Sequence, residues 1–331
     1  MRLENTLALT HGKLVSEPFV NSFTNIVFEA NKVKRGDLFI AFDEDSIAEA
    51  VFNGAYGVIF DKPTQISDSE IAWIKVQNIQ DALSRLLRFK LIEKDITVYE
   101  SNEIILKLAL QVITEPKFIV LDGDIKSIAH LLWNIEEKST ILFCPALHDS
   151  TLFAEVKPLP KTAILPITIM EQTLFETSFI YDDTFYERQL ISPFFMPFLE
   201  ELLHLLKTLK INFRLKKFIP IDHFEAVFTN KNFEPKEFGT SDKVLIFEKD
   251  KNLIDMEIKF LKRQANWAKI IYIVPCASEY EDDEDIYCYK NDKEVIRILK
   301  ENVFHFALIV GVDKSILSRP LSNQTQLTLD F

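Results

Sequence analysis

The stretch "NKVKRGDLFIAF", residues 31–42, joins a polar turn to a run of apolar residues. The predicted turn consists of Lys34, Arg35, Gly36 and Asp37. Residues 38–42 have the apolar character of a buried strand. The stretch "AEAVFNGAYGVIFDKP", residues 48–63, predicts a short helix that ends near Gly54 and then a second strand. Such close succession of strand, helix and strand predicts a compact α/β unit near the start of the chain.

Strand-like and helix-like segments alternate along most of the remaining sequence. Residues 151–235 differ, because they are richer in Phe and Pro and contain one long apolar helix near residues 194–209. Alternation of this kind predicts mainly parallel sheets covered by helices. We expect four segments, namely an N-terminal α/β domain (1–95), a central α/β domain (96–235), a C-terminal Rossmann-like α/β domain (236–319) and a tail (320–331).

Composition narrows the class of protein. The chain has 331 residues and a formal net charge of −12, which argues against direct binding of nucleic acid or an anionic membrane. Its apolar runs are too short or too charged for a membrane span, which needs about 18 apolar residues. The three cysteines, Cys144, Cys276 and Cys288, are widely spaced and odd in number, so they suggest neither a disulfide framework nor a zinc site. A reducing cytoplasm fits this cysteine usage.

Glycine is rare, with seven residues in 331. Average usage of about 7% would give about 23. Glycine is needed where the backbone must approach a ligand closely or adopt positive φ. The composition therefore argues against a glycine-rich phosphate-binding loop.

The segments "NKVKRGDLFIAF", "AEAVFNGAYGVIFDKP" and "WIKVQNIQDALSRLLRF" together resemble the N-terminal domain of the Mur ligases. These enzymes build the peptidoglycan stem peptide on a UDP-linked muramic acid, and the type that adds D-Ala-D-Ala is the most similar. The match covers residues 24–90, with a weaker similarity near the C-terminal helix and strand of residues 289–317. The resemblance implies a shortened, multi-domain α/β fold of three-layer sheets with helices on both faces. It also implies a UDP-muramoyl precursor or cell-wall synthesis proteins as partners, with ligand-binding residues at Asn31, Lys34, Arg35 and Asp37.

The sequence departs from the Mur ligase pattern where ATP would bind. The family has G-x-x-G-K-[ST] after its N-terminal domain, and its backbone N–H groups hold the phosphates. Here the corresponding stretch is "ITVYESNEIILK", residues 96–107, without glycine or the loop lysine and with Glu100 and Glu103 instead. We therefore expect no ATP cofactor and no catalytic residues, and we interpret the protein as a non-catalytic binding or scaffold component of peptidoglycan precursor synthesis. The alternative is a divergent ATP-dependent amide ligase with an unrecognised phosphate site.

Four other groups of residues carry functional groups, and each also has a structural explanation. Cys144 and His148 follow a strand, as a nucleophile or metal ligand would, although a capped loop explains them as well. Asp222 and His223 suit a general base or a structural hydrogen bond. The carboxylates in "YDDTFYER" could bind Mg²⁺, although a hairpin turn explains them equally well. The two aspartates of "VLDGD" end a strand and could hold a metal, yet no phosphate loop is present to supply a nucleotide.

The C-terminal sequence "QLTLDF" resembles the peptide by which bacterial proteins dock on the DNA sliding clamp. The partner-binding residues would be Gln326, Leu327, Leu329 and Phe331. In that interpretation the apolar side chains enter a hydrophobic groove and the glutamine fixes the register. The alternative is an edge strand added to the protein's own sheet.

Overall fold

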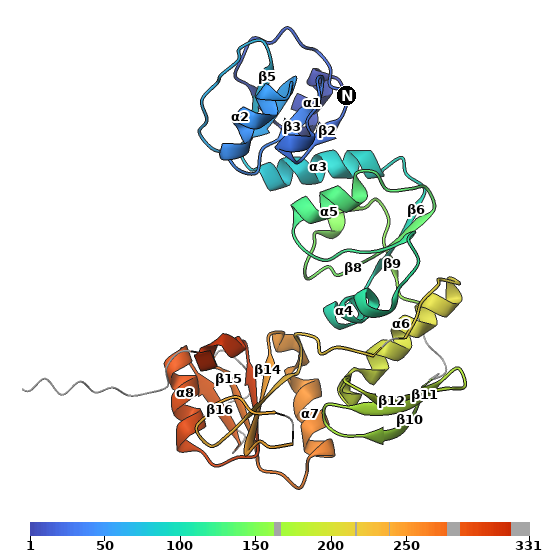
Figure 1. Ribbon diagram of the computed structural model, residues 1–331, viewed down its shortest axis with the longest axis vertical. Helices are drawn as coiled ribbons and strands as arrows, with labels where there is room; N and C mark the ends of the chain where they lie inside the picture. The colour runs from blue at the N-terminus through green and yellow to red at the C-terminus, as the bar shows by residue number, and fades with distance from the viewer. Residues whose placement is uncertain (162–166, 216, 238, 277–284, 319–331) are drawn as a thin grey trace, which may run out of the picture. The chain divides into compact units, whose positions relative to one another are not determined.

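The computed structural model describes residues 1–161, 167–215, 217–237, 239–276 and 285–318. The chain forms two compact units, Met1–Pro160 with Lys210–Phe213 and Lys161–Leu209 with Arg214–Phe331 (Figure 1).

The N-terminal unit begins with a five-stranded sheet in the order β1-β5-β4-β3-β2, parallel except for β1. Its strands are β1 (Lys13–Leu14), β2 (Ile26–Val27), β3 (Leu38–Ile40), β4 (Gly57–Phe60) and β5 (Ala72–Lys75). The helices around it are α1 (Leu3–Thr10), the short 3-10 helix η1 (Ala30–Lys32), α2 (Asp45–Phe52) and α3 (Ile79–Leu91). The helix α2 ends at Phe52, close to the predicted end near Gly54, and Gly54 has φ of 98°.

Both faces of this sheet are buried, because successive side chains of a strand point to opposite faces. In β5, Ile74 belongs to the core beneath α1 and α3, whereas Trp73 belongs to a second core beneath α2. The same alternation separates Ile59 from Val58 in β4. This explains why these strands are continuous apolar runs in the sequence.

A second, fully parallel sheet in the order β7-β8-β6-β9 completes the N-terminal unit. Its elements are β6 (Ile96–Glu100), α4 (Glu103–Val112), β7 (Phe118–Val120), α5 (Ile125–Leu132), β8 (Ser139–Phe143), η2 (Ser150–Leu152) and β9 (Lys157–Pro158). Helix α3 lies between the first sheet and α5 in Figure 1, and one apolar core continues from Ile74 through Leu86 to Ile141. The two sheets of this unit are thus joined by packing on α3.

The C-terminal unit contains an antiparallel sheet followed by a long helix. The elements are β10 (Ile167–Gln172), β11 (Thr177–Tyr181), β12 (Thr184–Gln189), η3 (Pro193–Phe195) and α6 (Met196–Thr208). Asp182 and Asp183 form the turn between β11 and β12 with φ of 51° and 59°. Positive φ at both central residues is typical of a tight hairpin turn, which favours the structural explanation for these carboxylates.

The last sheet has the order β13-β14-β17-β15-β16 and is parallel except for the edge strand β13. Its elements are β13 (Glu225–Thr229), β14 (Lys243–Glu248), η4 (Lys251–Leu253), α7 (Ile254–Gln264), β15 (Ile270–Pro275), β16 (Ile286–Tyr289), α8 (Asp292–Glu301), β17 (Phe306–Val310) and η5 (Lys314–Ser318). The boundary predicted between residues 235 and 236 falls between β13 and β14, which pair with each other. The division into four segments stays a prediction.

The abundant phenylalanines pack the middle of the C-terminal unit. The ring of Phe194, in η3, lies 5.3 Å from that of Phe224 and 5.5 Å from that of Phe260 on α7. Phe175 contacts Phe228 of β13 at 5.5 Å. Aromatic pairs at these separations stabilise a core beyond the area that they bury.

The cysteine spacing suggested no disulfide framework, yet Cys276 and Cys288 are joined by an S–S bond. The two residues are separated by 12 positions in the sequence, but β15 and β16 are adjacent parallel strands, which places them side by side. Spacing along the chain could not show this adjacency. Cys144 is buried elsewhere, in the N-terminal unit.

The predicted fold class is confirmed, since strands and helices alternate through parallel and mixed sheets covered by helices. Among the described residues, no helix is both long enough and apolar enough to cross a membrane.

Candidate functional site

A cavity of about 320 Å³ lies in the N-terminal unit, between the segments around β2 and the end of α5. Its lining residues come from the segment around β2, from the turn that precedes β3 and from the end of α5. They are Asn25, Ile26, Val27, Phe28, Glu29, Lys32, Lys34, Asp37, His130, Trp133 and Asn134. Its volume is at the small end of the usual range for sites that bind small molecules.

The turn at residues 34–37 is held by the carboxylate of Asp37, which is only 3% exposed. Its Oδ2 accepts a hydrogen bond of 2.9 Å from the backbone N–H of Lys34. Its Oδ1 accepts one of 3.3 Å from the side-chain amide of Asn25. Gly36 has φ of 98°, a conformation that favours glycine. Asp37 therefore positions the backbone of Lys34 and links the turn to the segment before β2.

Aromatic side chains form another part of the cavity lining. The ring of Phe28 meets Trp133 edge-to-face at 5.6 Å and His130 at 5.0 Å. Lys90 of α3 lies over the Trp133 ring at 5.7 Å. These contacts order the indole ring, and an ordered aromatic surface can stack against a planar ligand ring.

Both signs of charge occur among the lining residues. Lys32 pairs with Glu29 at 2.8 Å, and His130 lies 3.7 Å from the same carboxylate. The hydrogen bond from Lys32 lowers the pKa of Glu29, and the charges of Lys32 and His130 act in the same direction. The carboxylate is therefore ionised at neutral pH, and Lys34 adds a further cation.

The structure brings together two of the four predicted ligand-binding residues. Lys34 and Asp37 line the cavity. Arg35 is not among its lining residues and donates from Nε to the hydroxyl of Tyr56 at 3.1 Å. Asn31, exposed in η1, is not among them either.

Sequence reasoning missed the contribution of α5 to this cavity. His130, Trp133 and Asn134 have the i, i+3, i+4 spacing that places side chains on one helical face. That spacing was visible in "IKSIAHLLWNI". What the sequence did not show is that this face lies beside β2.

The connection between β6 and α4 is the stretch that the resemblance to the Mur ligases aligns with their phosphate loop. It consists of Ser101 and Asn102 only. The N–H of Ser101 donates to the carbonyl of Phe143 at 2.8 Å, and Asn102 Oδ1 accepts from the N–H of Ile105 at 2.9 Å. The asparagine side chain thus caps the helix at the end where a phosphate would otherwise accept hydrogen bonds.

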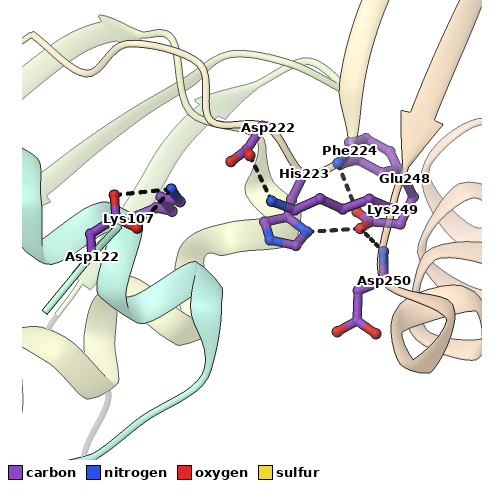
Figure 2. A network of polar contacts seen from close by, with 8 residues as sticks. All are labelled: Lys107, Asp122, Asp222, His223, Phe224, Glu248, Lys249 and Asp250. Carbon is purple, nitrogen blue, oxygen red and sulfur yellow. Dashed lines mark hydrogen bonds and ion pairs between the residues drawn. The ribbon is translucent and has the colours of Figure 1, made fainter. Parts of the chain in front are cut away.

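Lys107 and Asp122, also in the N-terminal unit, form an ion pair of 3.2 Å (Figure 2). Lys107 lies on α4 and Asp122 follows β7, within the "VLDGD" motif. The other aspartate of that motif, Asp124, caps α5 by accepting from the N–H of Ser127 at 2.8 Å. Both aspartates therefore have structural partners.

In the C-terminal unit, Asp222 and His223 have different partners. His223 Nδ1–H donates to Glu248 Oε1 at 2.7 Å, and Asp222 pairs with Lys249 at 2.6 Å (Figure 2). Burial alone would raise the pKa of Glu248, but the hydrogen bond and charge of His223, with the N–H of Asp250, lower it. The buried partner of the histidine is therefore a glutamate at the end of β14.

Glu257 on α7 is a second buried carboxyl group beside Glu248. Burial raises its pKa well above the ordinary value, and the negative charge of Glu248 adds to the effect. Glu257 is accordingly protonated under conditions in which Glu248 is ionised. One charged and one neutral carboxyl group share this part of the core.

His148 and the tail are the remaining groups of residues that the sequence singled out. His148 lies in the loop after β8, and its neighbour Asp149 caps η2 through the N–H of Thr151. Burial lowers the pKa of His148. The tail residues Gln326, Leu327, Leu329 and Phe331 lie outside the described residues, so docking on a sliding clamp stays a prediction.

Comparison with known proteins finds neighbours among solved structures. No protein-family model and no curated protein sequence matches the chain. A crystal structure of MurF from Acinetobacter baumannii is similar, with a TM-score of 0.51 and 9% identity over 97% of this chain and 98% of that one. MurF from Thermotoga maritima in complex with ADP has a TM-score of 0.46 and 12% identity over 89% of this chain and 95% of that one.

The fold of this protein is that of the Mur ligases. Identity of 9% supports the fold and nothing finer. The chemistry has to be argued from this chain's own residues.

Proposed function

We propose that this protein binds a UDP-linked muramoyl precursor without ATP-dependent ligation. It would act as a binding or scaffold component of peptidoglycan precursor synthesis. The observation that carries the non-catalytic part is the connection between β6 and α4, which has two residues and an asparagine cap. Phosphoryl transfer from ATP depends on cations and backbone donors around the phosphates, and this connection supplies too few of them.

The cavity of the N-terminal unit supports the binding part of the proposal. Trp133 and Phe28 offer aromatic surface for a planar base, and Lys32 and Lys34 offer cations for a diphosphate. Its volume of about 320 Å³ suits the nucleotide end of the precursor rather than the whole molecule. Asn25 and Asn134 supply side-chain amides that can donate to or accept from the edge of a base.

The test uses the full chain in two titrations. Isothermal calorimetry should show that a UDP-N-acetylmuramoyl peptide binds in the absence of ATP. In a separate titration of the protein with Mg²⁺-ATP alone, no binding should be seen. The second candidate, a divergent amide ligase, predicts the opposite for ATP. Micromolar ATP binding together with phosphate release on addition of the precursor would establish the ligase and overturn our proposal.

A further inference from the structure

Two cysteines lie side by side at the carboxyl ends of neighbouring strands in the C-terminal unit. Cys276 directly follows β15, and Cys288 is in β16, where it pairs with Val274. The N–H of Cys276 donates to the carbonyl of Tyr289 at 3.0 Å. The two Cα atoms are 4.7 Å apart, within the range that a disulfide spans without moving the backbone. The sheet therefore holds the sulfur atoms close together whether or not they are bonded.

The two cysteines are accessible to small thiols, unlike the third. Cys288 is exposed and Cys276 is half-buried. Cys144, by contrast, is only 2% exposed. Thiol–disulfide exchange requires a thiolate to reach a disulfide sulfur. The Cys276–Cys288 pair meets that requirement, and Cys144 provides an internal control.

The disulfide joins an edge strand to the rest of its sheet. Within the described part of the chain, β16 pairs with β15 alone, over four residues. Next to Cys288, the hydroxyl of Tyr289 donates to the carbonyl of Val310 at the end of β17, at 2.7 Å. The carboxyl ends of three parallel strands thus meet here, at the edge where open α/β sheets place ligands. The S–S bond is the covalent link that ties the outermost of these strands to its neighbour.

We propose that Cys276 and Cys288 form a reversible thiol–disulfide modification site, with a low-molecular-weight thiol such as glutathione as co-reactant. In reduction, a glutathione thiolate attacks the sulfur of Cys288, the more exposed residue of the pair, the S–S bond breaks, and Cys276 leaves as a thiolate that takes up a proton. A second glutathione thiolate then attacks the glutathione sulfur of the mixed disulfide and releases Cys288. Two electrons pass to the protein pair, and one oxidised glutathione forms. The reverse sequence restores the bond.

The proposal is tested on the full chain equilibrated in glutathione buffers that range from fully reduced to fully oxidised. The reaction is quenched by acid, free thiols are alkylated, and peptides are identified by mass spectrometry. Cys276 and Cys288 should become alkylated together, with one midpoint inside the range. Retention of the disulfide in the most reducing buffer, or two free thiols in the most oxidising one, would overturn the proposal.

Cysteine variants distinguish the reaction of the Cys276–Cys288 pair from any reaction of Cys144. Cys144→Ser should leave the midpoint unchanged. Cys276→Ser should leave Cys288 to form a mixed disulfide with one glutathione in oxidising buffer. Hydrogen exchange on the wild type should show faster exchange of the amides of β16 after reduction, with those of β17 unchanged. Equal exchange of β16 in both redox states would contradict the role of the bond in holding the edge strand.

Discussion

The imidazole of His223 and the carboxylate of Glu248 lie 2.7 Å apart, and both side chains are at most 1% exposed. The partners come from the loop before β13 and from the end of β14. The second oxygen of Glu248 accepts from the N–H of Phe224 at 2.9 Å. A carboxylate in such a position depends on its donors, because an uncompensated buried charge is costly.

The first prediction concerns this pair. His223→Leu removes the side-chain donor and leaves Glu248 buried, so the free energy of unfolding should fall by about 3–5 kcal/mol. Asp222→Asn, one residue away, changes an exposed ion pair with Lys249 and should cost less than about 1 kcal/mol. Urea denaturation of both variants measures the difference. Equal losses in the free energy of unfolding would show that the histidine–glutamate pair contributes no more to stability than the exposed Asp222–Lys249 pair.

The second prediction concerns the pH dependence of stability. The folded-state pKa of Glu257 is raised, so between the ordinary value of 4.5 and the raised value the folded protein holds a proton that the unfolded chain has lost. Stability contributed by this group is therefore present at low pH and is lost as the pH rises through the folded pKa. The slope can reach about 1.4 kcal/mol per pH unit. Glu257→Gln, which mimics the protonated acid, should remove this slope.

Thermal unfolding from pH 5 to pH 8 provides the measurement. The wild type should lose more stability than Glu257→Gln over this interval, and the two proteins should be most similar at pH 5. Glu301→Gln on the exposed surface of α8 is a matched control and should follow the wild type. The interpretation fails if Glu257→Gln and the control have the same pH profile.

The third prediction compares two basic neighbours in the turn before β3. Lys34 lines the cavity, whereas Arg35 contacts Tyr56 and does not line it. Lys34→Ala should weaken binding of a UDP-N-acetylmuramoyl peptide about tenfold, equivalent to about 1.4 kcal/mol, because a charge-assisted phosphate contact is lost. Arg35→Ala should change the affinity less than about threefold, which corresponds to well under 1 kcal/mol. Calorimetry that ranked the two variants in the opposite order would exclude this cavity as the nucleotide site.

The fourth prediction concerns the tail, for which sequence is the only support. Removal of residues 326–331 should abolish binding to a bacterial sliding clamp in surface plasmon resonance. Phe331→Ala should weaken it by about 2 kcal/mol or more, as expected of an aromatic anchor. Thr328→Ala, between the apolar positions, should have little effect. Unchanged affinity after the truncation would rule out the motif.

Much of the secondary structure followed from local patterns. The Asn-Gly pair at residues 53–54 predicted the end of α2, and the apolar run at residues 38–42 contained β3. Asn78, Asn102 and Asn291 are N-caps that we did not predict, although each helix begins directly after its cap. These signals act within a few residues, so they survive in a single sequence.

The residues of the candidate site could be predicted only in part from the sequence. The resemblance to the Mur ligases named Lys34 and Asp37, which line the cavity, whereas Trp133 and His130 come from the region of a helix about a hundred residues later. The adjacency of Asp222 and His223 suggested a dyad, yet the histidine bonds to Glu248, 25 residues away. Asp222 and His223 lie in a bend before β13, and their side chains have different partners, so adjacency in the sequence did not predict the contact.

The sequence by itself determined where many strands and helices lie and where the helix near Gly54 ends, and it argued against a glycine-rich phosphate loop, because all of these depend on the conformational preferences of nearby residues. Only the tertiary structure decided which buried charges meet, which cysteines bond and which side chains line the cavity. These contacts depend on strand order and register, as in the pairing of Val274 with Cys288. Order and register are set by packing across the whole unit, and no local periodicity encodes them.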